Sequence, residues 1–233
     1  GGNLKPILFN TEMVKAILDG RKTVTRRLVK LPSYVKLEED GTYTLYAEGT
    51  AYGKQCMEQL VPYLRKPCEP GDILYVRETY ANISDFVNYA EYELDSDLKY
   101  LYKCDDNGEE HAFVDIGVKR WRPSIHMPKE AARIFLKVTN VRVERLQDMN
   151  QEDALKEGLV IQCHRADDDC SAYLKCNFQN SAACLEKFRE LWNSTIPKKD
   201  PSDMYKYGWK ANPWVWVIEF ERISKEESYE SNN

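Results

Sequence analysis

Two stretches of alternating apolar residues constrain the fold of this chain most strongly. The first covers residues 133–146, where the apolar positions are Ile134, Leu136 and Val138 and then, in a shifted phase, Val141 and Val143. A period of two is the pattern of a β-strand, and the phase shift near Asn140 predicts a bulge or bend in that strand. Residues 214–220 predict a second strand. Long strands that bend are what a small β-barrel requires.

Short helices are predicted between the strands. Residues 11–19 carry one apolar stripe, with Asn10 or Thr11 available as an N-cap and Gly20 at the C-terminal end. Further helices are predicted after Asn150, ending at Gly158, and over residues 181–192, whereas residues 23–29 and 73–76 predict strands. This order lacks the spacing of βαβ units, so we predict an α+β fold built on a small β-barrel with short flanking helices.

The domain organisation follows from length and polarity. The chain has 233 residues, which fits one domain, predicted over residues 5–223. Polar segments near residues 33–66, 85–110 and 160–180 are interpreted as insertions. The tail at residues 224–233 is polar, and we expect it to be frayed.

The charge distribution limits the possible partners. The formal net charge is −5, which argues against a general duplex-DNA binder. Residues 1–30 nevertheless carry a local charge of +5, which permits a small anion-binding surface. No apolar run approaches the roughly 20 residues that span a bilayer, and no secretory leader opens the chain. We therefore expect a cytoplasmic protein that does not bind membranes.

The cysteines do not form a recognisable metal motif. The chain has seven cysteines and no CxxC pair. The segment from Cys163 and His164 through Cys170 and Cys176 to Cys184 offers possible ligands, but free thiols in a reducing compartment are the simpler interpretation. We expect no structural metal and no cofactor.

The segment of residues 20–27 carries the chemistry-bearing residues. It places Lys22 directly after a helix and the Thr25 hydroxyl three residues later, in extended chain. A lysine in this position can simply neutralise the carbonyl end of the helix. Glu157 occupies the end of another predicted helix, where the dipole disfavours a carboxylate by roughly 0.3–1 kcal/mol unless a cation or substrate compensates.

The same segment resembles the signature of the ASCH family, relatives of the PUA RNA-binding modules, which reads Gly-x-Lys-x-x-Glu-x-Arg. Gly20, Lys22 and Arg27 match, and Thr25 replaces the glutamate. Threonine at this place is similar to the N4-acetylcytidine amidohydrolase branch of the family. Further segments resemble ASCH proteins common in phage and prophage genomes, namely residues 5–9, 71–78, 122–128 and 212–220.

The resemblance implies an amidohydrolase in which Lys22, Thr25 and Glu157 are catalytic. In one order of events, Lys22 accepts the proton of Thr25, Thr25 attacks the acyl carbonyl, and Glu157 protonates the departing nitrogen. In the other, Glu157 activates water while Lys22 stabilises the oxyanion. Both Lys22 and Thr25 are expected in the cleft and outside the core. Arg21 and Arg26 are the cations expected to lower the pKa of Lys22.

Substrate contacts are predicted for five residues: Arg21, Arg26, Arg77, Trp121 and His126. Trp121 and His126 belong to a loop that is placed at the cleft rim, where an aromatic ring can stack on a base. A tryptophan that completes the core is the competing interpretation for Trp121. Arg77 either lines the cleft or pairs with Glu78.

Three functions follow from these features. The first is hydrolysis of an acyl amide on a modified nucleoside such as N4-acetylcytidine. The second is RNA or nucleotide binding without catalysis, as in the PUA relatives. The third is ribonuclease action, which also occurs among ASCH proteins, although the sequence has no compact acidic triad to support it.

Overall fold

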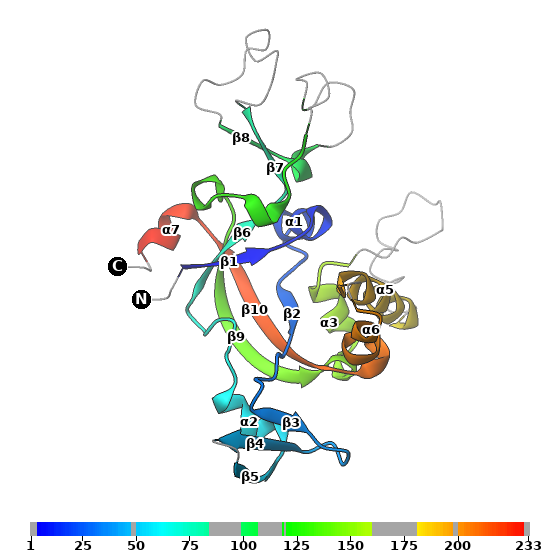
Figure 1. Cartoon of the computed structure of the whole chain (residues 1–233). Coiled ribbons are helices and arrows are strands. Elements are labelled where there is room, and N and C mark those ends of the chain that lie inside the picture. Colours follow the sequence, from blue (N-terminus) through cyan, green and yellow to red (C-terminus); the bar gives the residue numbers. More distant parts are fainter. Residues whose placement is uncertain are drawn as a thin grey trace.

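The chain folds around one five-stranded mixed sheet, with smaller sheets at its periphery (Figure 1). The computed structural model describes residues 4–47, 50–83, 99–106, 118, 120–159, 181–197 and 200–230. The central sheet has the order β1–β6–β9–β10–β2. Its strands are β1 (Leu4–Leu8), β6 (Ile73–Arg77), β9 (Phe135–Arg145), β10 (Trp214–Ile223) and β2 (Val24–Leu28). Only β1 and β6 pair in parallel; the other pairs are antiparallel. The predicted α+β class is confirmed.

The two longest strands bend where the alternation of the sequence shifts. In the pairing of β9 with β10, Glu219 lies opposite Asn140 and Phe220 lies opposite Val138, which leaves Thr139 as the extra residue of a bulge. Both strands are strongly curved (Figure 1). The predicted bulge near Asn140 is therefore confirmed.

Among the described residues, the five strands do not close into a barrel. The edge strands β1 and β2 share no backbone ladder. A side chain joins them instead, because Nη2 of Arg27 on β2 donates a hydrogen bond to the carbonyl oxygen of Leu8 on β1 at 2.9 Å. The sheet is thus curved and open between its two edges.

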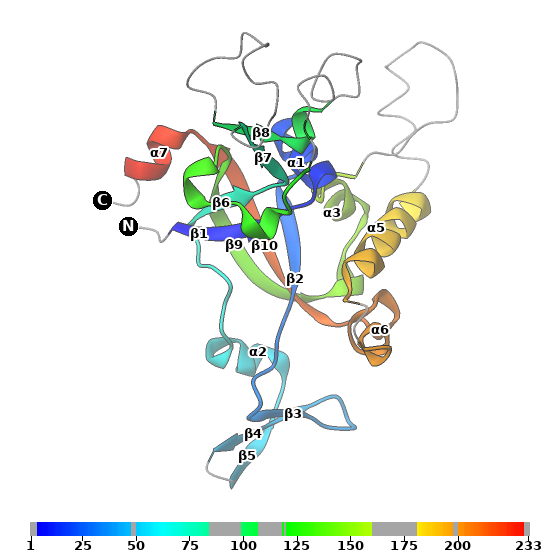
Figure 2. The same ribbon diagram turned by 45° about the horizontal axis from the view of Figure 1, so that its top comes forward.

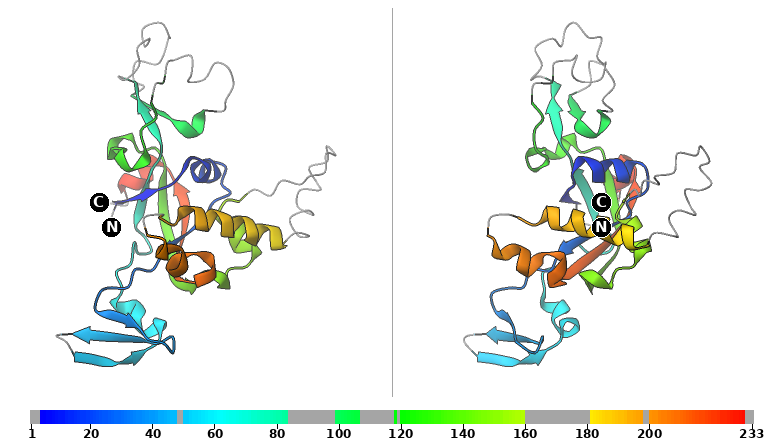
Figure 3. Two further views of the ribbon diagram at one scale, coloured as in Figure 1. Left: turned by 45° about the vertical axis from the view of Figure 1, so that its right-hand side comes forward. Right: turned by 90° about the vertical axis from the view of Figure 1, so that its right-hand side faces the viewer.

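The remaining elements extend or cover this sheet. They are α1 (Thr11–Leu18), β3 (Val35–Leu37), β4 (Tyr43–Ala47), β5 (Thr50–Gln55), α2 (Met57–Leu60), η1 (Val61–Tyr63), β7 (Tyr80–Asn82), β8 (Tyr100–Tyr102), η4 (Lys103–Asp105), η5 (Ser124–His126), η6 (Lys129–Ala131), η7 (Leu146–Asp148), α3 (Gln151–Lys156), α5 (Ser181–Thr195), α6 (Ser202–Tyr207), η8 (Trp209–Ala211) and α7 (Lys225–Glu230). Strands β3–β5 form one end of the molecule and β7–β8 the other (Figure 3).

Two apolar cores pack against the central sheet next to β2. The larger core includes Phe9, Val14 and Trp216 and lies between α1 and the sheet. The second core packs α3 and α5 against the opposite side chains of β2 and β10, through residues such as Phe188 and Trp192. Figure 2 shows α3 and α5 side by side next to β2. Strand β2 therefore has one core on each of its faces.

The predicted insertion at residues 33–66 and the predicted frayed tail both contain regular structure. The polar segment at residues 33–66 forms β3–β5 and α2, and its buried residues Val35, Met57 and Leu60 join the larger core. The tail that was expected to be frayed forms α7, where Ser228 is buried and the ring of Tyr229 lies 6.4 Å from that of Phe135. The predicted insertion at residues 160–180 lies outside the described residues.

Candidate functional site

Lys22 is placed by the end of helix α1. The side chain of Asn10 accepts a hydrogen bond from the backbone of Met13 and so begins the helix, as predicted. Gly20 ends it with a φ of 72°, a conformation that favours glycine. The next amides, of Arg21 and Lys22, both donate to the carbonyl oxygen of Ala16. This turn directs the chain into β2 with Lys22 on its inner side.

The ammonium of Lys22 is completely surrounded by acceptors. Its Nζ donates to Oε2 of Glu157 at 2.7 Å, to the carbonyl oxygen of Glu157 at 3.0 Å and to that of Val24 at 2.8 Å. Its side chain has no exposed surface. Burial lowers the pKa of Lys22 from its ordinary value; the charge of Glu157 opposes this shift, and the charges of Arg27 and Arg26 reinforce it.

Glu157 is placed by the end of helix α3. Asn150 caps the start of this helix, and Glu157 is its C-terminal cap, as predicted. The following residue, Gly158, has a φ of 90°, and a Cβ atom built there lies 2.6 Å from Cβ of Ala16 and 2.9 Å from Cβ of Lys22. Only glycine lets the two chain segments approach this closely. Lys22 and Glu157 also form an isolated backbone bridge.

Arg26 reaches the other oxygen of the same carboxylate. Its Nη1 lies 3.1 Å from Oε1 of Glu157, and its side chain is 1% exposed. Its Nη2 lies 3.8 Å from a carboxylate oxygen of both Glu144 and Asp153. Nε and Nη2 have no hydrogen-bond partner among the described residues. Lys22 and Arg26 are thus the cations that compensate the carboxylate at the helix end.

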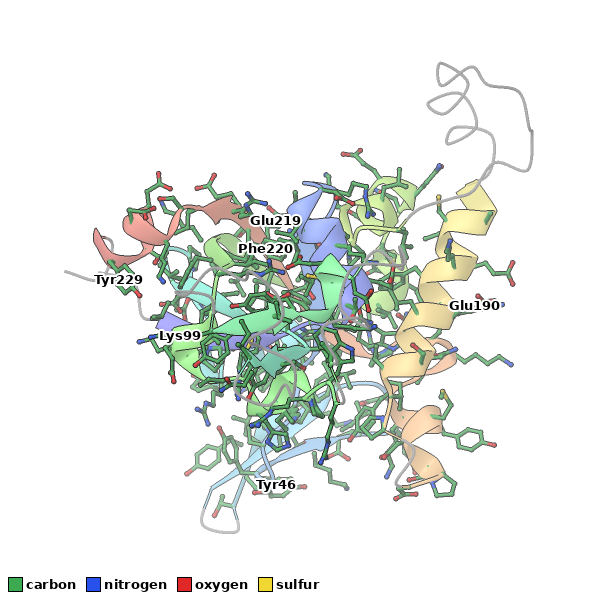
Figure 4. All side chains as sticks on the ribbon, turned by 90° about the horizontal axis from the view of Figure 1, so that it is seen from above. Tyr46, Lys99, Glu190, Glu219, Phe220 and Tyr229 are labelled. Atoms are coloured by element: carbon green, nitrogen blue, oxygen red, sulfur yellow. The ribbon has the colours of Figure 1, made fainter. Side chains whose placement is uncertain are left out.

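Two cavities adjoin this cluster. The smaller one has a volume of about 30 Å³ and places Thr25, Arg26 and Glu157 opposite Phe188 and Trp192 of α5. The larger one has a volume of about 350 Å³ and is lined by Arg21, Gly158, Lys187 and Glu190, among others. Met13, Glu157 and Leu191 line both cavities. Figure 4, which labels Glu190, shows α5 running along this side of the molecule.

The three residues predicted to be catalytic are therefore neighbours, but they are more deeply buried than expected. Lys22 is 2% exposed, Thr25 1% and Glu157 4%. The expectation that Lys22 and Thr25 lie outside the core is wrong, because β2 is covered on both faces. Thr25 pairs with Ile218 of β10, which belongs to the larger core, whereas the preceding residue Val24 belongs to the second core.

The arginines predicted to contact substrate have different positions. Arg26 lies in the cluster. Arg21 lines the larger cavity, where its Nη1 donates to the carbonyl oxygen of Gly158 at 2.6 Å and its Nη2 pairs with Asp19. Arg21 is not among the cations that lower the pKa of Lys22; Arg27 takes that place.

Arg77 and its neighbour Glu78 serve another part of the fold. Arg77 donates from Nε to the carbonyl oxygen of Met127 at 2.9 Å and from Nη2 to that of Ile125, and so holds the loop that contains η5. Glu78 is buried and pairs with Arg133. Neither of the two predicted arrangements, lining the cleft or pairing with each other, is present.

Trp121 and His126 line neither of the two cavities. Trp121 is half-buried and packs against a small apolar cluster that includes Ala81 and Leu101 of β7 and β8. Lys103 lies 5.1 Å from the centre of its ring. His126 is exposed at the end of η5. The surroundings of Trp121 agree with the competing interpretation, in which this residue completes a core.

Several neighbours of the cluster were not predicted from the sequence. Phe9 places its ring 5.6 Å from Nζ of Lys22 and 5.4 Å from the guanidinium of Arg27. Helix α5 supplies the apolar wall of the smaller cavity. The amphipathic pattern of residues 181–192 predicted that helix, but the pattern does not indicate which surface the helix covers.

No group of three or more His, Cys, Asp and Glu side chains in the described part of the chain is arranged to hold a metal ion. Cys163, His164, Cys170 and Cys176, the possible ligands noted above, lie outside the described residues, and Cys184 is a buried free thiol. No helix of the described ranges is both long and apolar enough to cross a bilayer.

Comparison with protein-family models, curated proteins and solved structures found no match for this chain.

Proposed function

We propose that this chain is an ASCH-type, PUA-like amidohydrolase that removes an acyl group from a modified nucleoside such as N4-acetylcytidine. Lys22, Thr25 and Glu157 are the reacting groups. The observation that carries the proposal is the buried pair of Lys22 and Glu157, 2.7 Å apart, in which Glu157 lines two cavities and Thr25 lies in the wall of the smaller one.

Burial supports a proton-transfer role for this pair. Taking the ammonium of Lys22 out of water is costly, so its surroundings favour the neutral amine, while Arg26 compensates the charge of the Glu157 carboxylate. The lowered pKa of Lys22 has the direction that such a base requires.

The acyl transfer starts from the neutral amine of Lys22. The amine of Lys22 accepts the hydroxyl proton of Thr25 while Oγ bonds to the acyl carbonyl carbon. Lys22 passes this proton across their 2.7 Å contact to Glu157, which delivers it to the exocyclic nitrogen as the carbon–nitrogen bond breaks. The nucleoside leaves with a free amino group, and the acyl group remains as an ester on Thr25.

Water completes the cycle. It attacks the ester and gives a proton to Glu157, which passes it to Lys22, and Lys22 returns it to the departing Thr25 oxygen. The products are the free acid and the starting hydroxyl. Nε and Nη2 of Arg26, which have no hydrogen-bond partner among the described residues, are the donors available to a developing oxyanion, since the three donors of Lys22 are all engaged. This favours Thr25 as nucleophile over Lys22 as oxyanion stabiliser.

The same arrangement gives less support to RNA binding without catalysis. A polyanion is held by exposed cations that can approach its phosphates. Lys22 and Arg26 have almost no exposed side-chain surface, and both pair with Glu157.

The test is incubation of the protein with N4-acetylcytidine, followed by chromatography of cytidine and acetate. We expect turnover by the wild type and none by Thr25→Val, which keeps the shape of the side chain and removes the hydroxyl. Thr23→Val is the matched control, because Thr23 precedes the same strand and is exposed. Absence of wild-type turnover on this and other N4-acylated cytidines would contradict the proposal.

A further inference from the structure

We propose that the smaller cavity is the acyl pocket of this enzyme and that helix α5 limits the acyl group to about the size of acetyl. The inference rests on the amidohydrolase activity proposed above and specifies the substrates that this activity accepts.

The residues that line each cavity indicate which part of the substrate each cavity holds. Thr25 lines only the smaller cavity, Gly158 and Arg21 line only the larger one, and Glu157 lines both. An amide whose carbonyl carbon faces Thr25 and whose nitrogen faces Glu157 therefore extends its acyl group into the smaller cavity. Its nucleoside extends into the larger one.

The volumes agree with this assignment. The larger cavity, at about 350 Å³, falls in the usual range of small-molecule sites, roughly 300–1,000 Å³. The smaller cavity, at about 30 Å³, is an order of magnitude smaller. A space needs roughly 10–15 Å³ to admit one water molecule, and a methyl group is of similar size. The volume of the smaller cavity thus matches an acetyl group better than a long acyl chain.

The lining chemistry also suits a short acyl group. Apolar residues of α5, namely Phe188, Leu191 and Trp192, line one side of the cavity, whereas the polar residues Thr25 and Arg26 of β2 line the other. A methyl group packs against the apolar wall while the carbonyl oxygen remains near the polar side. An acyl group has an apolar and a polar part and therefore matches a lining with an apolar and a polar side. A water molecule does not need the apolar side.

The wall is rigid for a structural reason. Phe188 and Trp192 are buried in the second core, and their rings lie 6.3 Å apart. Densely packed side chains cannot move aside for a longer acyl chain without losing contacts. Leu191 is only half-buried, so its side chain is the part of the wall that can be shortened with the least damage to the fold.

The experiment measures kcat/KM for N4-acetyl-, N4-butyryl- and N4-hexanoylcytidine. We expect the wild type to prefer acetyl over butyryl by at least about tenfold, the discrimination typical of a pocket that must reject extra methylene groups. Leu191→Ala enlarges the pocket and should reduce this preference by about tenfold. Leu185→Ala is the matched control, since Leu185 lies on the same helix and lines neither cavity. It should keep the wild-type preference.

Met13→Ala is a second enlarging variant on a different helix, which keeps the test valid if Leu191→Ala fails to fold. Equal kcat/KM for the three substrates in the wild type would overturn the acyl pocket and leave the amidohydrolase proposal standing. An unchanged acetyl preference in both enlarging variants, with melting temperatures near that of the wild type, would also overturn it. No hydrolysis of any of the three substrates would overturn both proposals.

Discussion

Replacing Gly158 by alanine tests how closely helix α1 and the start of β2 approach helix α3. The alanine methyl group must occupy space that lies 2.6 Å from Cβ of Ala16 and 2.9 Å from Cβ of Lys22. Neither neighbour is the flexible end of a side chain, so helix α1 and the start of β2 must move away from α3. This movement lengthens the contact between Lys22 and Glu157.

The expected loss in the free energy of unfolding has two contributions. A positive φ costs alanine roughly 1–2 kcal/mol relative to glycine. Overpacking costs about 1–3 kcal/mol in addition. Gly71 separates the two contributions, because its φ is 91° and a Cβ atom built there meets no atom within 4 Å. Gly71→Ala should therefore show the backbone cost alone.

Thermal unfolding of the wild type and both variants gives the comparison. For a chain of this size, 1 kcal/mol corresponds to about 2–4 °C in melting temperature. We expect Gly158→Ala to melt about 2–12 °C below Gly71→Ala, and to lose activity that Gly71→Ala retains. Equal melting temperatures in the two variants would refute the close approach of α1, β2 and α3 at this glycine.

Three further predictions concern the charged cluster and metals. Glu157→Gln should lower kcat by about 10²–10⁴-fold while ligand binding survives, and the exposed Glu152→Gln is the control. If the protein only binds RNA, Glu157→Gln should bind RNA as tightly as the wild type or more tightly, and there is no turnover to lose. The pKa of Lys22 is lowered by burial, so between that pKa and 10.5 the unfolded state binds more protons and the free energy of unfolding should rise with pH. Urea unfolding at several pH values measures this rise, and Lys22→Met should remove the part of the rise that Lys22 contributes. The same pH dependence in Lys22→Met and in the wild type would argue against a buried, titrating Lys22. Treatment with a chelator should change neither melting temperature nor turnover, and a stoichiometric metal in the purified protein would contradict this expectation.

The strands and helices were predictable because each carries a local signal. The bulge at Thr139 leaves a phase shift in the alternation, and Asn150 and Gly158 mark both ends of α3. The structure within residues 33–66 was missed because short, exposed strands such as β5 bury almost nothing and so carry no alternation. Helix α7 was missed because its burial depends on Ser228 and on Tyr229 meeting Phe135, contacts that composition does not indicate.

The candidate site was predictable only in part. The resemblance brought Lys22, Thr25 and Glu157 together, and the structure has them as neighbours. Their depth was not predictable, since it arises from α5 covering β2, a contact between segments far apart in the sequence. The predicted roles of Trp121 and Arg77 rested on loop position alone, and loops carry no periodicity that fixes where a side chain points.

Mass spectrometry of the protein during turnover tests the central claim most directly. The protein is mixed with N4-acetylcytidine, quenched in acid within the first turnover and digested. If Thr25 is the nucleophile in the Lys22–Glu157 site, the peptide that contains Thr25 gains the mass of one acetyl group, and neither Thr25→Val nor Glu157→Gln accumulates this product. Turnover by the wild type with no acylated Thr25 at any quench time, and full turnover by Thr25→Val, would contradict the account.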